Sequence, residues 1–208
     1  MAGPASNYAK VLALPGIKEL IAAKVRYLVV VGGAFGGGPA DPNIKADIAA
    51  AKKLFAEWPG PIVAVGAEMA QAALYPASSI EKDFAYTEAH PVVDAYRAYK
   101  AMPYDATTWD LAAVLYAVRP NENYFKLSAP GVIKVGDDGR TQFTPSADGT
   151  HRYLIADPAQ KDKLLKTYIE LVSAKPVPRA PRFRRPVQQK KDDAKKPDDA
   201  KPVTPPRN

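Results

Sequence analysis

Two short polar segments of this chain have residue types and spacing that suit the binding of a small polar ligand. The first follows a glycine-rich stretch and carries Asp41 and Asn43, two residues apart. A carboxylate accepts hydrogen bonds, whereas an amide both donates and accepts them, so this pair could hold the hydroxyl groups of a sugar. Capping of a following helix is the simpler explanation of the same two residues when the segment is taken alone.

The second polar segment is Thr108-Trp109-Asp110. Thr108 suits the N-cap of a helix, which places Trp109 and Asp110 in the first turn, where an acidic side chain complements the helix dipole. The same pair could supply a metal-binding carboxylate beside an aromatic ring that stacks on a planar ligand. These two interpretations are compatible, so this segment is a second candidate site.

A predicted strand positions the first segment. Val25–Val31 is rich in β-branched apolar residues, which is typical of a strand covered on both faces. It ends at the loop Gly32–Gly38, and such strand ends are where open α/β sheets bind ligands. The loop matches no phosphate-binding motif. Its glycines either let the backbone approach a ligand closely or form a flexible surface loop.

Strands and helices are predicted to alternate along the rest of the chain. Helices are expected over 47–58, 68–74, 91–102, 108–118 and 157–173, and strands over 61–65, 124–127, 132–135, 141–143 and 153–155. Asp137-Asp138-Gly139 is a hairpin turn signal. This order predicts an α/β fold: an open, mainly parallel sheet flanked by helices, with a small β-hairpin region near the C-terminus. The expected buried stripes of two helices are Leu111, Val114, Leu115 and Val118, and Leu164, Leu165, Ile169 and Val172.

Composition divides the 208 residues into a domain over 1–174 and a tail over 175–208. The tail carries 11 basic and 4 acidic residues and 8 of the 21 prolines, whereas the domain carries 18 residues of each sign. The net charge of +7 therefore comes from the tail, which is predicted to be disordered. Arg179–Arg185 could bind nucleic acid or an acidic surface weakly, although a solvated tail without a partner is favoured.

Several classes of site are disfavoured by the residues present. The chain has no cysteine, so a disulfide framework and a thiolate site are excluded. His90 and His151 lack a second ligand at metal spacing and are interpreted as structural. Ser78-Ser79 lacks the nucleophile-elbow pattern of serine hydrolases. No signal-peptide pattern or long apolar run is present, so we expect a cytoplasmic protein without a membrane partner.

At these candidate segments the chain resembles the inosine–uridine preferring nucleoside hydrolases, over most of residues 2–174. The similarity lies in the order and spacing of four segments that are each weak alone. The family's Gly-Pro-Leu-Thr-Asn segment is similar to Gly3-Pro4-Ala5-Ser6-Asn7, and its Val-Val-Met-Gly-Gly strand end is similar to Val29-Val30-Val31-Gly32-Gly33. Its Glu-Phe-Asn-Ile segment is similar to Asp41-Pro42-Asn43-Ile44. Its His-Asp-Pro-Leu-Ala-Val segment is similar to Trp109-Asp110-Leu111-Ala112-Ala113-Val114.

The resemblance implies a calcium (Ca²⁺) ion at the strand ends and hydrolysis of the N-glycosidic bond of ribonucleosides to free base and ribose. It implies that Asp110 ligates Ca²⁺, that Ser6 does so through its main-chain carbonyl, and that Asp41 and Asn43 bind the ribose hydroxyls. Trp109 stands where many members carry a histidine thought to help the base leave. A tryptophan cannot give up a proton there, although it can stack on the base.

The family also opens with an Asp-x-Asp-x-x-x-Asp-Asp motif that supplies the general base and most Ca²⁺ ligands. This chain contains no such motif, so the resemblance implies the C-terminal portion of the fold, weak or inactive alone. No catalytic residue is identified. Ca²⁺ takes about six to eight oxygen ligands, more than the two assigned above. The sheet is then expected to present a bare edge or face, which favours association.

Three hypotheses remain open at this point. The first is an incomplete nucleoside hydrolase, and the second is a non-catalytic nucleoside- or ribose-binding protein that depends on an N-terminal partner chain or on a homo-oligomer. The third is a nucleic-acid binder that acts through Arg179–Arg185. Preference for purine or pyrimidine bases is also open.

Overall fold

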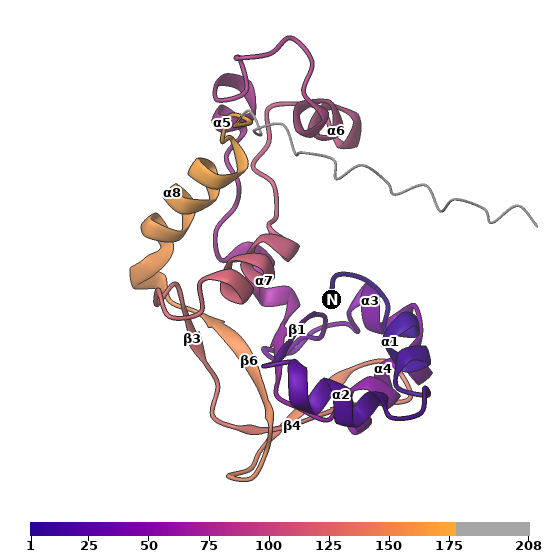
Figure 1. Ribbon diagram of the computed structural model, residues 1–208. Coiled ribbons are helices and arrows are strands. Elements are labelled where there is room, and N and C mark those ends of the chain that lie inside the picture. The colour runs from indigo at the N-terminus through magenta and orange to yellow at the C-terminus, as the bar shows by residue number, and fades with distance from the viewer. Residues whose placement is uncertain (178–208) are drawn as a thin grey trace, which may run out of the picture. The chain divides into compact units, whose positions relative to one another are not determined.

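The computed structural model describes residues 1–177, of which Met1–Lys175 make one compact unit (Figure 1). The predictions for the tail, including Arg179–Arg185, concern residues that lie almost entirely outside the described part. They therefore stay predictions. No helix among the described residues is long and apolar enough to cross a membrane.

The elements alternate as an α/β fold requires. The strands are β1 (Leu28–Val31), β2 (Ile62–Val65), β3 (Phe125–Leu127), β4 (Gly131–Val135), β5 (Thr141–Pro145) and β6 (His151–Ala156). The helices are α1 (Ser6–Val11), α2 (Ile17–Lys24), α3 (Pro42–Lys45), α4 (Ile48–Glu57), α5 (Ala77–Lys82), α6 (Pro91–Tyr99), α7 (Trp109–Val118) and α8 (Lys161–Val172). Two 3₁₀ turns, η1 (Ala67–Gln71) and η2 (Pro158–Gln160), complete the order.

The sheet is open and mixed, with strand order β1-β2-β6-β4-β5 and with β3 paired to β6. β1, β2 and β6 are parallel neighbours, whereas β3, β4 and β5 pair antiparallel. The expected α/β fold with flanking helices is confirmed, but parallel pairing is limited to these three strands. The predicted β4–β5 hairpin forms, and Gly139 adopts φ +79° in its turn, a conformation that glycine adopts without strain.

The two faces of the parallel strands are covered by different helices. Leu28, Val30, Ile62 and Ala64 pack with residues of α1, α2 and α4 in one apolar cluster. The alternate residues Val29, Val31, Val63 and Val65 pack with Ala112 and Ala113 of α7 in another. This alternation follows from the period of two in a strand and explains why β1 and β2 are apolar at every position.

Helix α7 corrects two predictions. It packs on the sheet through Ala112 and Ala113, and Leu115 is buried in a separate cluster with residues of α5, α6 and α8. Val114 and Val118 are 60% and 67% exposed, so the expected buried stripe is wrong at two of its four positions. Small residues let the helix lie close to the strands, and this turns the larger valines outward. Thr108 occupies the N-cap position but does not cap, because its hydroxyl donates to the carbonyl of Ala73 at 2.9 Å.

Element ends differ modestly from the predicted ones. β1 begins at Leu28, because Val25 still donates its N–H to the carbonyl of Ile21 at the end of α2. The buried residues of α8 are Leu164, Thr167 and Tyr168, whereas Leu165, Ile169 and Val172 are half-buried. Helices α1, α2 and α5 were not predicted.

Candidate functional site

Asp41 lies at the carboxyl end of β1, where it caps α3. Its Oδ1 accepts hydrogen bonds from the backbone N–H groups of Asn43 and Ile44 at 2.8 and 3.3 Å. The side chain is buried, and burial raises the pKa of its carboxyl group against the opposing effect of these two N–H donors. One carboxylate oxygen thus holds the helix, and Oδ2 makes no hydrogen bond among residues 1–177.

Asn43 ties the same helix to the strand end. Its Nδ2 donates to the carbonyl of Val31 at 3.1 Å, and the residue is half-buried. The amide oxygen Oδ1 has no hydrogen-bond partner within the described residues. Asp41 and Asn43 therefore each use one side-chain atom for the fold and leave one oxygen without a partner among the described residues, so the capping and ligand-binding interpretations are compatible.

Met1 connects β1 with Asp110. Its ammonium donates to the carbonyl of Val29 at 2.6 Å, and its carbonyl accepts from Val31 N–H at 2.8 Å. Ala2 bridges Val31 in parallel on the edge of β1 away from β2. Burial lowers the pKa of the Met1 ammonium, and the nearby Asp110 carboxylate opposes that shift. The Met1 ammonium, which is held on β1, therefore lies close enough to Asp110 for their charges to interact.

The glycine-rich loop has an anchored half and an open half. Gly33 has φ +97°, and a side chain there would meet the Phe35 ring and Thr141 Oγ1 at 3.0 Å. Thr141 Oγ1 also accepts from Ala34 N–H at 3.0 Å, and Phe35 stacks on Tyr153 with ring centroids 4.4 Å apart. The early glycines thus serve packing within the protein. Gly36, Gly37 and Gly38 have open space around them.

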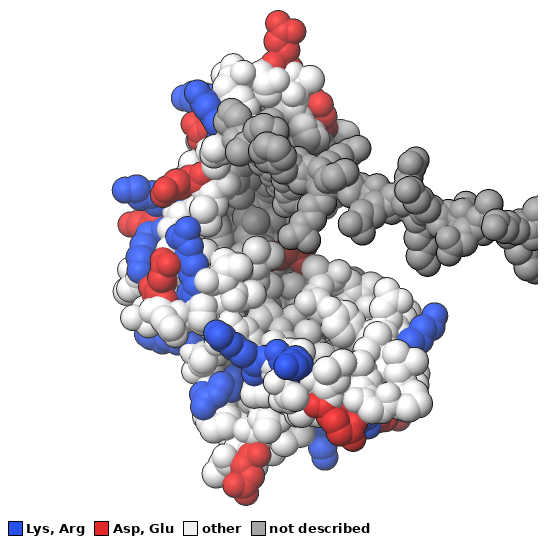
Figure 2. All heavy atoms as spheres, in the orientation of Figure 1, with Lys and Arg blue, Asp and Glu red and all other residues white. Residues whose placement is uncertain are grey.

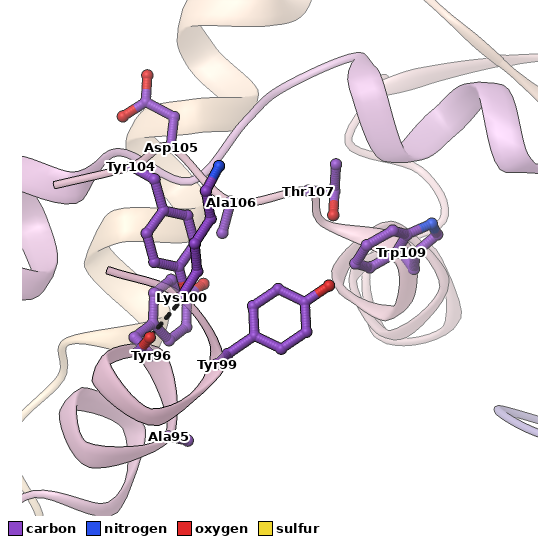
Figure 3. A pocket seen from close by; sticks show the side chains of 9 residues that line it. All are labelled: Ala95, Tyr96, Tyr99, Lys100, Tyr104, Asp105, Ala106, Thr107 and Trp109. Carbon is purple, nitrogen blue, oxygen red and sulfur yellow. Dashed lines mark hydrogen bonds between the residues drawn. The ribbon is translucent and has the colours of Figure 1, made fainter. Parts of the chain in front are cut away.

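An aromatic cleft of about 560 Å³ lies between α6 and α7, with Trp109 at one end (Figure 3). Its other rings are Tyr96, Tyr99 and Tyr104, of which Tyr96 and Tyr104 are stacked at 5.8 Å. Tyr104 also donates its hydroxyl hydrogen bond to the carbonyl of Tyr96 at 2.8 Å. Tyr99 and Trp109 are 77% and 49% exposed and face each other across the opening. Such a cleft suits a flat apolar group.

Sequence reasoning found Trp109 but missed these tyrosines. Tyr96 and Tyr99 stand three residues apart, which places them on neighbouring positions of one helical surface. That spacing was a signal for a shared aromatic surface. The contribution of Tyr104, which follows the end of α6, depends on the path of the chain and had no local signal.

Ser6 and Asp110 do not make a metal centre by themselves. The Ser6 hydroxyl donates to Asp47 Oδ2 at 2.6 Å, and this bond holds the pKa of the Asp47 carboxyl below its usual range. Asp110 is exposed in the first turn of α7. Residues 1–177 contain no group of three His, Cys, Asp or Glu side chains that could hold a metal ion. The donor set present therefore does not fit Ca²⁺.

The surface in Figure 2 carries charged side chains of both signs and is mainly uncharged over α1 and α3. No broad basic face is visible in this view. The view agrees with the equal numbers of acidic and basic residues in 1–174.

Comparison with solved structures identifies the architecture. A purine-preferring ribonucleoside hydrolase from Gardnerella vaginalis matches with a TM-score of 0.63 and 21% identity over 83% of this chain. The inosine–uridine preferring nucleoside hydrolase of Bacillus anthracis matches with a TM-score of 0.59 and 19% identity over 83% of this chain. A plant nucleoside hydrolase, PpNRh1, matches with a TM-score of 0.60 and 22% identity over 80% of this chain. The fold is that of the nucleoside hydrolases.

The likeness to the nucleoside hydrolase fold covers only part of those proteins. This chain spans 60%, 58% and 59% of the three matched chains, respectively. The sequence matches no protein-family profile and no curated protein. The likeness establishes the fold and does not distinguish an inosine–uridine subfamily from a purine-preferring one.

Proposed function

We propose that this chain is the ribose- and base-contacting portion of a nucleoside hydrolase that cleaves the N-glycosidic bond of ribonucleosides. The observation that carries the proposal is the pair of side-chain oxygens, on Asp41 and Asn43, that have no partner among the described residues at the carboxyl end of β1 within a nucleoside hydrolase fold. The free oxygens of Asp41 and Asn43 accept hydrogen bonds from the ribose hydroxyls. Trp109, at the end of the aromatic cleft, stacks on the base.

Catalysis requires groups that the described residues do not supply. Water must be activated by a general base, and Ca²⁺ needs more oxygen ligands than Asp110 and the Ser6 carbonyl provide. We therefore propose that a further acidic segment, in the same polypeptide or in a partner chain, completes the site. Two features support this: among residues 1–177 the outer edge of β1 is bridged only at Ala2, and α7 exposes Val114 and Val118.

A second candidate is a binding protein without catalysis. It is favoured by the contrast between the ligand-binding groups at the end of β1 and the absence, in residues 1–177, of a cluster able to hold a metal ion. In this case the pocket retains ribose and base, and no bond is cleaved.

Binding to the proposed pocket is tested by the fluorescence of Trp109 in the Trp58→Phe variant, which leaves Trp109 as the single tryptophan. Inosine and uridine are titrated against this variant, with ribose as a ligand that cannot stack. We expect saturable quenching by the nucleosides that weakens when Asn43→Ala is added. Quenching that is linear in nucleoside, or unchanged by Asn43→Ala, would contradict the proposed pocket.

A further inference from the structure

A second cavity, of about 470 Å³, lies on the α4 side of the sheet and away from the site described above. Its position follows from the strand register. His151, which lines it, is the first residue of β6 and is paired in parallel with Ile62, the first residue of β2. It therefore lies at the amino end of these strands, whereas Asp41 follows the carboxyl end of β1. The two sites are separate.

Two ring N–H groups that line this cavity lack acceptors. Trp58 Nε1 is buried and has no hydrogen-bond partner in the part of the chain that is described. His151 is 5% exposed, and its Nδ1 accepts from Ile133 N–H at 2.9 Å, which places the ring proton on Nε2. No acceptor for this Nε2–H lies among residues 1–177. Burial lowers the pKa of His151, so the ring is neutral near pH 7 and keeps this arrangement.

The remaining walls are partly apolar, and the rim carries charges of both signs. Phe55 meets the His151 ring edge-on with centroids 6.0 Å apart, and Ile133 is fully buried beside it. The charged residues that line the cavity are Lys52, Lys134 and Asp148. Lys52 is paired with Asp137, whose side chain is fully exposed and easily displaced.

An N–H donor buried without an acceptor costs free energy that a ligand acceptor restores. Trp58 Nε1–H is such a donor, and His151 Nε2–H is a second ring donor without a protein acceptor among residues 1–177. Two N–H donors beside the Phe55 ring suit one acceptor group with two oxygens on a flat apolar body. Lys134, which has no acidic partner among the described residues, favours an anion over a neutral acceptor. A carboxylate meets each of these conditions, since it accepts from two donors at once.

We propose that this cavity binds a small carboxylate with a flat apolar body, held by Trp58 Nε1 and His151 Nε2 and packed against Phe55. The volume lies within the usual range for small-molecule pockets, roughly 300–1,000 Å³. The proposal does not depend on nucleoside hydrolysis, because it uses no residue of the site at the end of β1.

The test is a titration of the full chain with sodium benzoate, followed by the NMR signals of the ring N–H groups. The chain has two tryptophans and two histidines, and one of each lines the cavity. Trp109 and His90 are therefore internal controls. We expect saturable shifts of Trp58 Nε1–H and the His151 ring, with no shift at Trp109 or His90. Sodium chloride and benzyl alcohol serve as salt and uncharged controls.

Trp58→Phe is the decisive variant, because it removes the N–H and keeps an apolar ring. Loss of one hydrogen bond to a charged group should weaken benzoate binding by about tenfold. The thermal midpoint without ligand should be unchanged or higher, since the deleted N–H has no partner in the protein. Trp109→Phe should bind benzoate as the parent does.

Three outcomes would overturn the proposal. They are shifts of Trp58 that rise linearly with benzoate, equal shifts at both tryptophans, and equal benzoate affinity in Trp58→Phe. Binding of benzyl alcohol as tight as that of benzoate would also overturn the assignment of a carboxylate.

Discussion

At the scale of single residues, the candidate site consists of side chains with two uses. Asp41 caps α3 with one carboxylate oxygen, and Asn43 holds Val31 with its amide nitrogen. The structural bonds orient each side chain so that its second oxygen keeps a fixed direction before a ligand arrives. Such preorganisation lowers the entropy lost on binding. The capping bonds would therefore favour the ligand-binding role proposed for these two residues.

Substitutions of Asp41 separate these two roles. Asp41→Ala removes the cap and should lower the free energy of unfolding by about 1 kcal/mol. Asp41→Asn keeps an acceptor for the N–H groups of Asn43 and Ile44 and removes a charge that burial disfavours, so its stability should equal or exceed that of the parent. Urea unfolding of the three proteins at pH 7 measures both effects. Equal losses in the two variants would contradict the capping role.

His151 should make stability depend on pH. Burial lowers its folded pKa below the unfolded value of about 6.5, so the unfolded chain takes up a proton first as the pH falls. The stability that comes with the neutral, buried His151 ring is therefore fully present above about pH 6.5 and decreases as the pH falls below that value. Asp41, whose folded pKa is raised, acts in the opposite sense at lower pH. The free energy of unfolding, measured with urea at pH 7.5 and 5.5, should differ less between the two pH values in His151→Asn than in the parent. An equal difference in the two proteins would refute this assignment.

At the scale of elements, α7 links the core to the site. Its alanines allow close packing on β1 and β2, and its first turn presents Trp109 and Asp110 at the end of the sheet. The helix is apolar on nearly every side, a pattern typical of a helix covered all round. Yet Val114 and Val118 lie exposed. This outer face is the surface that the proposed acidic segment would cover.

Paired substitutions in α7 test which face is structural. Leu115→Ala removes a buried side chain and should lower the free energy of unfolding by about 2–5 kcal/mol. Val114→Lys alters an exposed position and should change the free energy of unfolding by less than about 0.5 kcal/mol. The same substitution should reduce self-association of the chain, because it places a charge on an exposed apolar face. Chemical unfolding and analytical ultracentrifugation give the two readouts. A loss of several kcal/mol in Val114→Lys would show that this face is buried.

Local patterns predicted where elements lie better than which way they face. β1, β2, α4 and α7 follow from apolar runs and their flanking residues, and the glycine-rich strand end located the candidate site. The face of α7 could not be predicted from the chain, because four large apolar residues outweigh two alanines until the sheet is present. Thr108 failed as a cap for a similar reason, since the Ala73 carbonyl that it binds is 35 residues away. The position of Met1 beside Asp110 is likewise a tertiary contact.

At the scale of the whole molecule, the proposed function needs more groups than the described residues supply. Asp41 and Asn43 lie at the carboxyl end of β1, Asp110 is exposed in the first turn of α7, and the aromatic cleft lies between α6 and α7. The chain spans about three fifths of the nucleoside hydrolases that it matches. Helix α7 packs against β1, and the outer edge of β1 and the exposed face of α7 are the two surfaces that the proposed additional strand and helix would cover. Completion at this edge is the central claim.

The measurement that tests this claim most directly is release of free base from inosine and uridine by the 208-residue chain, with Ca²⁺ and with chelator. It is made alone and after fusion of an Asp-x-Asp-x-x-x-Asp-Asp strand segment ahead of Met1. The account predicts that the chain alone releases no free base and that the fusion releases it in a Ca²⁺-dependent way. If the added segment also covers α7, Val114→Lys should abolish release by the fusion. Ca²⁺-dependent release by the unfused chain at the same rate would contradict it.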